Sequence, residues 1–350
     1  MSAVMVSYIW AGAALKLRPS SKGRTMNTQM KWKIARAFSV VIVMTGIVSI
    51  LTGCANYPRD QSSKLEIGFI EINSDINLRR MIVHNSRPKG IVLFLHGFPE
   101  TLYAWRDISL ILARDYEVHA FDWPGYGLSS RSPVDRFSYA PQDYAYILKA
   151  YIEKAGIDTS KLIIYATDIG ALPSLLLALE EPNLAKTIIV GDFAPFNRPQ
   201  YMYESLQSLK SKPSSDVTRA YMNKNRDEIL ENAYRRGFSK EEQFDISQEF
   251  KDDMFRGWSQ NNMTSADAFY YYYSHFTRDQ DYFESNLTKL KTPIKVIWGE
   301  RDFYIKKEMG IEFSKKTNVE LILLPNLGHY PHLQSPQQTI EEIHASFNKR

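Results

Sequence analysis

The sequence predicts an α/β fold, in which a mostly parallel sheet is flanked by helices and a helical cap is inserted late in the chain. The first observation behind this prediction is that short, β-rich apolar runs alternate with segments of helical periodicity, a pattern typical of parallel sheets. The second is that the alternation stops between residues 194 and 290, which are rich in Tyr, Phe, Met and charges. With 350 residues and 44% hydrophobic content, the chain can bury a large core.

The expected elements follow one another in a regular order. Strands are expected at 67–72, 78–84, 91–95, 161–165, 187–190 and in a run that ends near Asp122, and helices at 101–114, 141–155, 171–179 and 336–349. The alternation resumes at "TPIKVIWGERD" and "NVELILLPNLGHYPH". We therefore expect one α/β domain, residues 65–193 and 291–350, with a helical cap at 194–290. A cleft at the carboxyl ends of the strands, under the cap, is the expected ligand site.

The first 53 residues differ from the rest of the chain. They contain seven Lys or Arg and no Asp or Glu, and a basic patch at Lys31, Lys33 and Arg36 precedes an apolar run at 37–51. These features are typical of a secretory leader. The following "LTGC", residues 51–54, resembles the bacterial lipobox. The resemblance implies a signal over about residues 30–53, cleavage before Cys54 and a lipid on that cysteine.

A lipid on Cys54 implies anchoring in the bacterial cell envelope, with the polar residues 54–64 as a tether. An Asp directly after the lipidated cysteine would favour retention at the inner membrane. This chain has Ala55 there, which favours the outer membrane. The alternative is a plain membrane anchor with an incidental cysteine. Cys54 is the chain's only cysteine, which excludes an internal disulfide. Beyond the leader, 36 basic and 39 acidic side chains give no indication of nucleic-acid binding.

Five motifs carry a resemblance to the α/β-hydrolase superfamily, and they occur in that family's order: "HGFPE" (96–100), "DWPGYGLSS" (122–130), "ATDIG" (166–170), "WGERD" (298–302) and "GHYPHLQSP" (328–336). The third motif resembles the strand-to-helix elbow that presents a nucleophile. Its central residue is Asp168 rather than serine. An aspartate elbow resembles the branch that contains epoxide hydrolases and haloalkane dehalogenases.

The chemistry of a carboxylate explains why Asp168 suits that branch. A carboxylate is ionised at neutral pH, and attack at saturated carbon gives a stable alkyl-enzyme ester. The resemblance implies that His329 then activates water, that the backbone N–H groups of Phe98 and Ile169 hold the oxyanion, and that a small-molecule substrate reacts without cofactor or metal. The alternatives are a helix N-cap role for Asp168 and a surface-loop role for His329.

The acid that supports His329 has two candidates. Asp302 follows the penultimate strand, the usual position in the family, whereas Asp192 in "VGDFAP" follows an earlier strand, as in some relatives. We favour Asp302 and leave Asp192 as the alternative acid. His332 competes with His329 but lies one turn later. His96 and Asp122 are expected to organise loops.

The two candidate reactions, epoxide opening and halide displacement, differ in the group that leaves the carbon. A departing halide needs N–H donors, and the side chains of Phe98 and Ile169, at the positions where dehalogenases place them, have none. An opening epoxide needs an acid, usually a tyrosine hydroxyl. We therefore expect an epoxide hydrolase that forms a vicinal diol. The alternatives are a haloalkane or haloacid dehalogenase with the same nucleophile, and a non-catalytic binding protein of this fold.

Tyrosines of the predicted cap are the candidate acids. "AFYYYYSHF", residues 268–276, places four tyrosines on one helix, where successive side chains point about 100° apart. By resemblance, counting back from Pro293 selects Tyr272, with Tyr271 or Tyr273 after a slip of one residue. Tyr201 and Tyr203 are candidates for the second acid, with Tyr203 preferred. The alternative is that these aromatic residues only pack the cap.

Overall fold

The computed structural model describes residues 64–348. The predicted leader, Cys54 and nearly all of the predicted tether therefore lie outside the described residues. Within residues 64–348, no helix combines the length and apolar character needed to cross a membrane.

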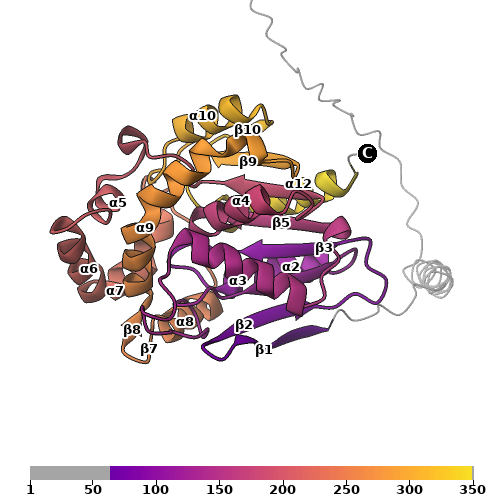
Figure 1. Ribbon diagram of the computed structural model, residues 1–350, viewed down its shortest axis with the longest axis horizontal. Helices are drawn as coiled ribbons and strands as arrows, with labels where there is room; N and C mark the ends of the chain where they lie inside the picture. Colours follow the sequence, from indigo (N-terminus) through magenta and orange to yellow (C-terminus); the bar gives the residue numbers. More distant parts are fainter. Residues whose placement is uncertain (1–63, 349–350) are drawn as a thin grey trace, which may run out of the picture. The chain divides into compact units, whose positions relative to one another are not determined.

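An eight-stranded sheet forms the centre of the fold, in the order β1-β2-β4-β3-β5-β6-β9-β10 (Figure 1). The pairs β1–β2 and β2–β4 are antiparallel, and all other neighbours are parallel. This arrangement confirms the predicted α/β class. The strands are β1 (Leu65–Asn73), β2 (Ile76–Val83), β3 (Ile91–Leu95), β4 (Glu117–Phe121), β5 (Leu162–Thr167), β6 (Thr187–Gly191), β9 (Ile294–Gly299) and β10 (Leu321–Leu324).

Helices cover both faces of the sheet. In Figure 1, α3 (Pro141–Lys154) and α4 (Ala171–Glu180) pack against each other on the near face, and α2 (Arg106–Leu112) contacts α12 (Pro336–Asn348) behind it. A further helix, α10 (Lys307–Thr317), packs on β9 and β10. Every residue of β3 and β5 is buried, because a parallel strand between two helical layers has no solvent face.

Between β6 and β9 the chain leaves the sheet and is mostly helical. The longest helix there, α9, begins at a capping box formed by Thr264 and Asp267. A short hairpin, β7–β8, was not predicted, because strands of two residues leave no alternation to detect. The elements are α5 (Glu204–Ser208), α6 (Ser214–Lys224), α7 (Arg226–Asn232), α8 (Gln248–Gly257), β7 (Ser259–Gln260), β8 (Met263–Thr264) and α9 (Ser265–Ser285).

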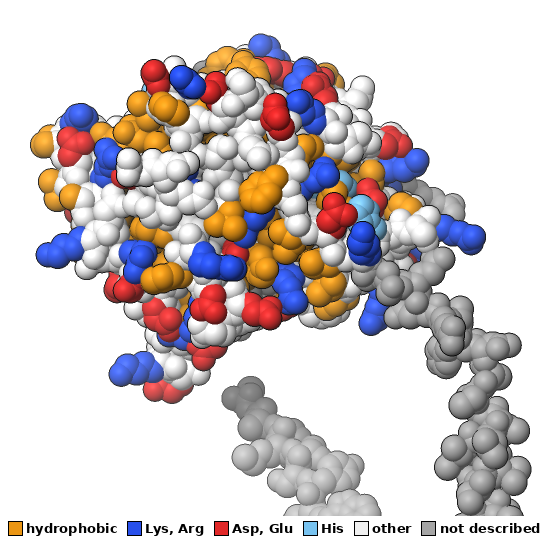
Figure 2. All heavy atoms as spheres, turned by 90° about the horizontal axis from the view of Figure 1, so that it is seen from below, with side chains coloured by type: hydrophobic (Ala, Val, Ile, Leu, Met, Phe, Trp, Pro, Cys, Tyr) orange, Lys and Arg blue, Asp and Glu red, His pale blue; other side chains and the backbone are white. Residues whose placement is uncertain are grey.

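Short helices complete the fold. One of them, η3, contains the predicted nucleophile. They are η1 (Leu102–Trp105), η2 (Thr159–Lys161), η3 (Asp168–Gly170), η4 (Pro199–Tyr201), η5 (Ala233–Arg235), η6 (Leu287–Lys289) and α11 (Pro331–Gln334). On the face shown in Figure 2, acidic and basic side chains are interspersed rather than gathered into a block of one sign. This face therefore lacks the basic patch that nucleic-acid binding requires.

Candidate active site

The turn between β5 and α4 holds Asp168 in an unusual backbone conformation. Its φ of 49° lies in the left-handed region, which a non-glycine residue rarely adopts. The surroundings are tight. A Cβ at Gly97 would lie 2.7 Å from the Asp168 Cβ, and a Cβ at Gly170 would lie 3.1 Å from the His96 carbonyl oxygen. Glycine at these two positions allows the elbow to approach the "HGFPE" loop.

The structure brings three predicted site residues into one hydrogen-bonded chain. His329 Nε2 lies 2.9 Å from Asp168 Oδ2, and His329 Nδ1 lies 2.8 Å from Asp302 Oδ2. Asp302 follows β9 and His329 follows β10, so neighbouring strand ends deliver both residues to the elbow. A carboxylate, an imidazole and a second carboxylate in this order are the arrangement expected of a nucleophile–base–acid triad.

The backbone fixes the orientation of Asp302. Its Oδ1 accepts hydrogen bonds from the Tyr304 and Ile305 N–H groups, at 2.8 and 3.0 Å, which leaves Oδ2 for the imidazole. The Tyr304 ring packs on His329, with ring centroids 5.0 Å apart. These contacts hold the imidazole between the two carboxylates.

Asp192 lies beside this chain rather than in it. It is fully buried, and its Oδ1 accepts the Gly299 N–H at 2.8 Å. Burial and the charge of Asp302 raise the pKa of Asp192 well above its ordinary value. A raised pKa makes Asp192 the poorer partner for a positive imidazole, and the hydrogen bond of His329 Nδ1 goes to Asp302, so both observations favour Asp302 as the partner of His329.

One oxygen of Asp192, one of Asp302 and one nitrogen of His329 lie within 4.8 Å of one another, close enough to consider a metal ion. Burial lowers the pKa of His329, but the carboxylates of Asp302 and Asp168 outweigh it and raise that pKa well above the ordinary value. Both ring nitrogens of His329 already bond to carboxylate oxygens, Nδ1 to Asp302 and Nε2 to Asp168, so we interpret this cluster as a hydrogen-bonded one.

Burial also raises the pKa of Asp168, and its bond to His329 offsets part of this effect. The Ile169 backbone N–H is hydrogen-bonded to the same carboxyl group and lowers its pKa. One predicted oxyanion donor thus faces the nucleophile. The second predicted donor is Phe98. Its carbonyl accepts a hydrogen bond from the Tyr330 hydroxyl at 2.8 Å, which links the loop of Phe98 to the loop of His329.

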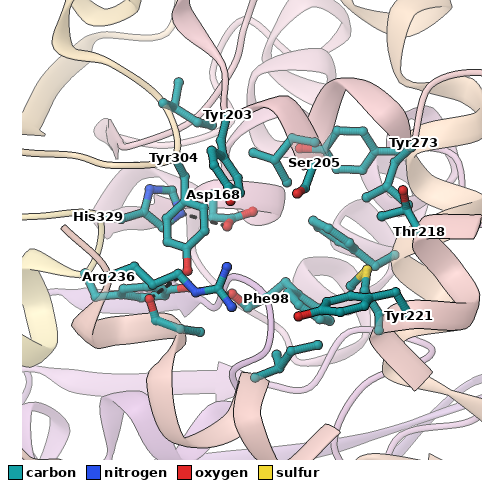
Figure 3. Close-up of a pocket in the computed structure, with 18 residues that line it drawn as sticks. Phe98, Asp168, Tyr203, Ser205, Thr218, Tyr221, Arg236, Tyr273, Tyr304 and His329 are labelled. Carbon is teal, nitrogen blue, oxygen red and sulfur yellow. Dashed lines mark hydrogen bonds and ion pairs between the residues drawn. The ribbon is translucent and has the colours of Figure 1, made fainter. Parts of the chain in front are cut away.

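A pocket of about 730 Å³ opens in front of Asp168 and His329 (Figure 3). Helices of the insertion contribute much of its wall, together with loops at the strand ends. Among the residues that line it are Phe98, Asp168, Tyr203, Leu206, Leu209, Met222, Ile229, Arg236, Phe269, Tyr273, Tyr304, His329 and Tyr330.

The pocket corrects one tyrosine prediction. Tyr272 points into the protein, where its hydroxyl donates to the Ile169 carbonyl at 3.1 Å, and it is not among the described residues that line the pocket. Tyr273, the candidate after a one-residue slip, does line it. Neighbouring side chains on a helix point about 100° apart. A shift of one residue therefore decides whether a tyrosine points into the core or into the pocket. Tyr271 instead stacks on Tyr139.

Tyr203 and Tyr273 both line the pocket and come from opposite ends of the insertion. Figure 3 shows them beside the space in front of Asp168. Burial and the charge of Asp168 raise the pKa of Tyr273 well above its ordinary value, so its hydroxyl keeps its proton. Tyr201, the other early candidate, is half-buried in η4.

Two predicted loop residues have structural partners. The His96 Nε2 accepts the Trp123 N–H at 3.1 Å, and Asp122 accepts the Arg79 Nε–H at 2.6 Å. The sequence analysis missed a buried pair in which His332 Nε2 lies 2.6 Å from Glu100 Oε1. The other Glu100 oxygen accepts the Gly97 N–H at 2.8 Å. This pair joins the oxyanion loop to the segment after His329.

Tyr304 and Arg236 are among the pocket residues that were not predicted. Tyr304 stands two residues after Asp302, so its closeness to the acid was a signal in the sequence. Arg236 lies in the irregular part of the insertion, and no sequence motif marks it.

Comparison with known proteins places this site in a family. The model of the alpha/beta hydrolase fold matches residues 90–336, well over half of the chain. The chain therefore belongs to the α/β-hydrolase family. It is 24% identical over 298 residues to Epoxide hydrolase 1 of Caenorhabditis elegans, covering 78% of this chain and 70% of that protein. It is 25% identical over 286 residues to Epoxide hydrolase 4 of Homo sapiens, covering 74% and 72%.

Solved structures agree on the fold. Epoxide hydrolase VrEH1 from Vigna radiata superposes with a TM-score of 0.65 at 20% identity, covering 80% of this chain and 97% of that one. A loop variant of the haloalkane dehalogenase DbeA from Bradyrhizobium elkanii gives 0.66 at 18% identity, covering 81% and 96%. At these identities the likeness establishes the architecture and leaves the reaction to the site.

Proposed function

We propose that this hydrolase opens an epoxide to a vicinal diol. The observation that carries the proposal is an aspartate at the nucleophile elbow, bonded to His329 and facing a pocket whose tyrosines include the candidate acids Tyr203 and Tyr273. The names of the similar proteins Epoxide hydrolase 1 of Caenorhabditis elegans and Epoxide hydrolase 4 of Homo sapiens support the same conclusion.

In the first step, an Asp168 oxygen attacks an epoxide carbon and the carbon–oxygen bond of the ring breaks. Tyr273 or Tyr203 donates its hydroxyl proton to the departing oxygen. The products are a hydroxyalkyl ester of Asp168 and a tyrosinate. Two hydroxyls on separate segments can bind the epoxide oxygen together before either transfers a proton.

Ester formation removes the negative charge of Asp168, one of the two charges that raise the pKa of His329. The imidazolium then releases its proton, which neutralises the tyrosinate. Neutral His329 takes a proton from water, and the water oxygen attacks the ester carbonyl. The N–H groups of Phe98 and Ile169 donate hydrogen bonds to the oxyanion. Collapse releases the diol and restores the Asp168–His329 ion pair.

The dehalogenase alternative uses the same nucleophile, and a Burkholderia protein named Fluoroacetate dehalogenase, 29% identical over 134 residues, is among the similar sequences. The side chains of Phe98 and Ile169 still offer no N–H donor to a halide, which favours the epoxide. The third possibility is a binding protein without turnover.

Product analysis separates these functions. The body from residue 55 onward is incubated with a panel of epoxides and of chloro- and bromoalkanes, with Asp168→Asn as the control. Vicinal diol that the control does not form supports the proposal. Halide release without diol moves the assignment to a dehalogenase, and tight binding without either product indicates a binding protein.

We propose in addition that the protein is held at the cell envelope by a lipid on Cys54. The support is the "LTGC" sequence after a basic and apolar leader. In bacterial cells, the full chain should incorporate labelled palmitate and enter the detergent phase, and Cys54→Ser should abolish both. Unlabelled wild-type protein would reject the anchor and leave the hydrolase proposal unaffected.

A further inference from the structure

We infer that the pocket contains an anion-binding subsite at Arg236, and that the natural epoxide carries a carboxylate. This inference rests on the proposed function for the reaction but not for the binding. Arg236 lines the same pocket as Asp168 and His329. Figure 3 shows its guanidinium directed into that pocket, next to Tyr304.

The ion pair of Arg236 leaves part of the guanidinium for a ligand. Both Glu228 oxygens contact a single nitrogen, Nη2, at 2.9 and 3.1 Å. That arrangement differs from the two-nitrogen fork in which a carboxylate usually binds arginine, and Glu228 does not use the N–H groups of Nη1 and Nε. The Arg236 side chain is 28% exposed, so a molecule in the pocket can reach it.

The segment around Arg236 is fixed to the loop that carries the acid of the triad. The Tyr304 hydroxyl donates to the Ala233 carbonyl at 2.8 Å, and Arg301 Nη2 donates to the Gly237 carbonyl at 3.3 Å. Gly237 has a φ of +88°, and a Cβ there would lie 3.1 Å from the Phe303 Cβ. Bonds on both sides of Arg236 therefore preorganise its position, as a recognition residue requires.

The rest of the pocket indicates what other groups a ligand would present to it. Its wall includes the aliphatic residues Leu206, Leu209, Met222 and Ile229 and several aromatic rings. An apolar stem suits this wall. Asp168 suits an epoxide, the apolar wall suits an apolar stem, and Arg236 suits a carboxylate. The pocket therefore fits a molecule that contains all three groups.

Binding tests the subsite without any reaction. Unreactive alkanoates from butanoate to dodecanoate are titrated into wild-type protein by calorimetry, each against the primary amide of equal length. We expect at least one acid to bind about tenfold more tightly than its amide, because charge-assisted hydrogen bonds are stronger than neutral ones. Arg236→Leu should remove this preference, and Arg236→Lys should restore part of it.

Two further variants serve as comparisons. Arg226→Leu removes another arginine of the insertion, which is paired with Asp227 and is not among the described pocket residues, and it should keep the preference. Glu228→Gln removes the competing carboxylate and should tighten binding of the acid severalfold. Equal binding of acid and amide at every length, or an equal loss of both in Arg236→Leu, would overturn the subsite.

Turnover then connects the subsite to the reaction. The ω-epoxides of the same acids and amides are compared by kcat/KM, and the acid should be preferred by about tenfold in wild type only. If no epoxide reacts but the binding preference is present, the proposed function fails and the anion subsite stands. If epoxides react without preference for the acid, the subsite fails and the proposed function stands.

Discussion

His329 lies between two carboxylates, with Nε2 2.9 Å from Asp168 Oδ2 and Nδ1 2.8 Å from Asp302 Oδ2. Nucleophile and base are therefore paired in the resting site. The pair explains how one imidazole can be charged before the reaction and basic after it, because alkylation of Asp168 removes one of the two charges that hold its proton.

Replacing Asp168 with Asn should abolish turnover and lower the pKa of His329. The physical reason is the loss of a negative charge 2.9 Å from Nε2, which stabilised the imidazolium. Asp302 remains and still raises that pKa, so the shift is partial. NMR titration of the imidazole in wild type and variant measures it. A His329 pKa that is unchanged or higher in the variant contradicts this account of the ion pair.

Replacing the two candidate acids, Asp302 and Asp192, should lower kcat to very different extents. Asp302→Asn removes the carboxylate bonded to His329 Nδ1 and should lower kcat by about 10³–10⁴. Asp192→Asn replaces a carboxyl group that is not hydrogen-bonded to His329 with an amide of similar size, and it should change kcat by less than about tenfold. Steady-state kinetics, with circular dichroism to verify folding, compares them. A larger loss in Asp192→Asn than in Asp302→Asn would reverse the assignment.

Removing a tyrosine hydroxyl that faces the pocket should slow epoxide opening. Tyr273→Phe and Tyr203→Phe should each lower the rate of ester formation by about 10²-fold or more, and the double variant should lose it, because the leaving oxygen needs an acid. Tyr272→Phe is the matched control on the same helix and should retain most of the rate. Rapid-quench measurement of ester formation tests this. Full activity in the double variant rules out these acids.

The Glu100–His332 pair should stabilise the fold in a pH-dependent way. Burial alone raises the pKa of Glu100, but His332 and the Gly97 N–H outweigh it, so the pKa of Glu100 in the folded protein lies below its ordinary value. A lowered folded-state pKa gives stability that is complete above the unfolded-state value and is lost as the pH falls. Glu100→Gln should therefore lower the free energy of unfolding by about 2 kcal/mol near neutral pH.

Urea unfolding at pH 7 and at successively lower pH measures the contribution of Glu100. The difference between wild type and Glu100→Gln should shrink as Glu100 of the folded protein becomes protonated. Gln337→Ala, on the exposed side of α12, serves as a control with a small effect at every pH. A difference that grows on acidification contradicts the assigned direction of the pKa shift.

The fold was largely predictable because its periodicity is local. Runs such as 91–95 and 162–167 are apolar throughout and lie between segments of helical period, which fixes class and order. The elbow, Asp302 and His329 could be placed because short motifs mark the ends of particular strands. These features depend on residues close together in the chain.

The remaining features depend on contacts across the chain. Asp192 and Asp302 lie just after the ends of the paired strands β6 and β9, and sequence alone does not tell which carboxylate reaches His329. Tyr272 and Tyr273 differ by one helical step. Glu100 and His332 are 232 residues apart, and only the folded chain brings them together.

The central claim is a covalent ester on Asp168, and intact-mass spectrometry of the His329→Gln variant tests it most directly. Without its base, this variant should form the ester but not hydrolyse it. The variant is exposed to styrene oxide and, separately, to a bromoalkane. We expect a mass gain of one epoxide molecule, located on Asp168 by peptide mapping and absent when Asp168→Asn is added. A gain only from the bromoalkane, or a gain that survives Asp168→Asn, would contradict the account.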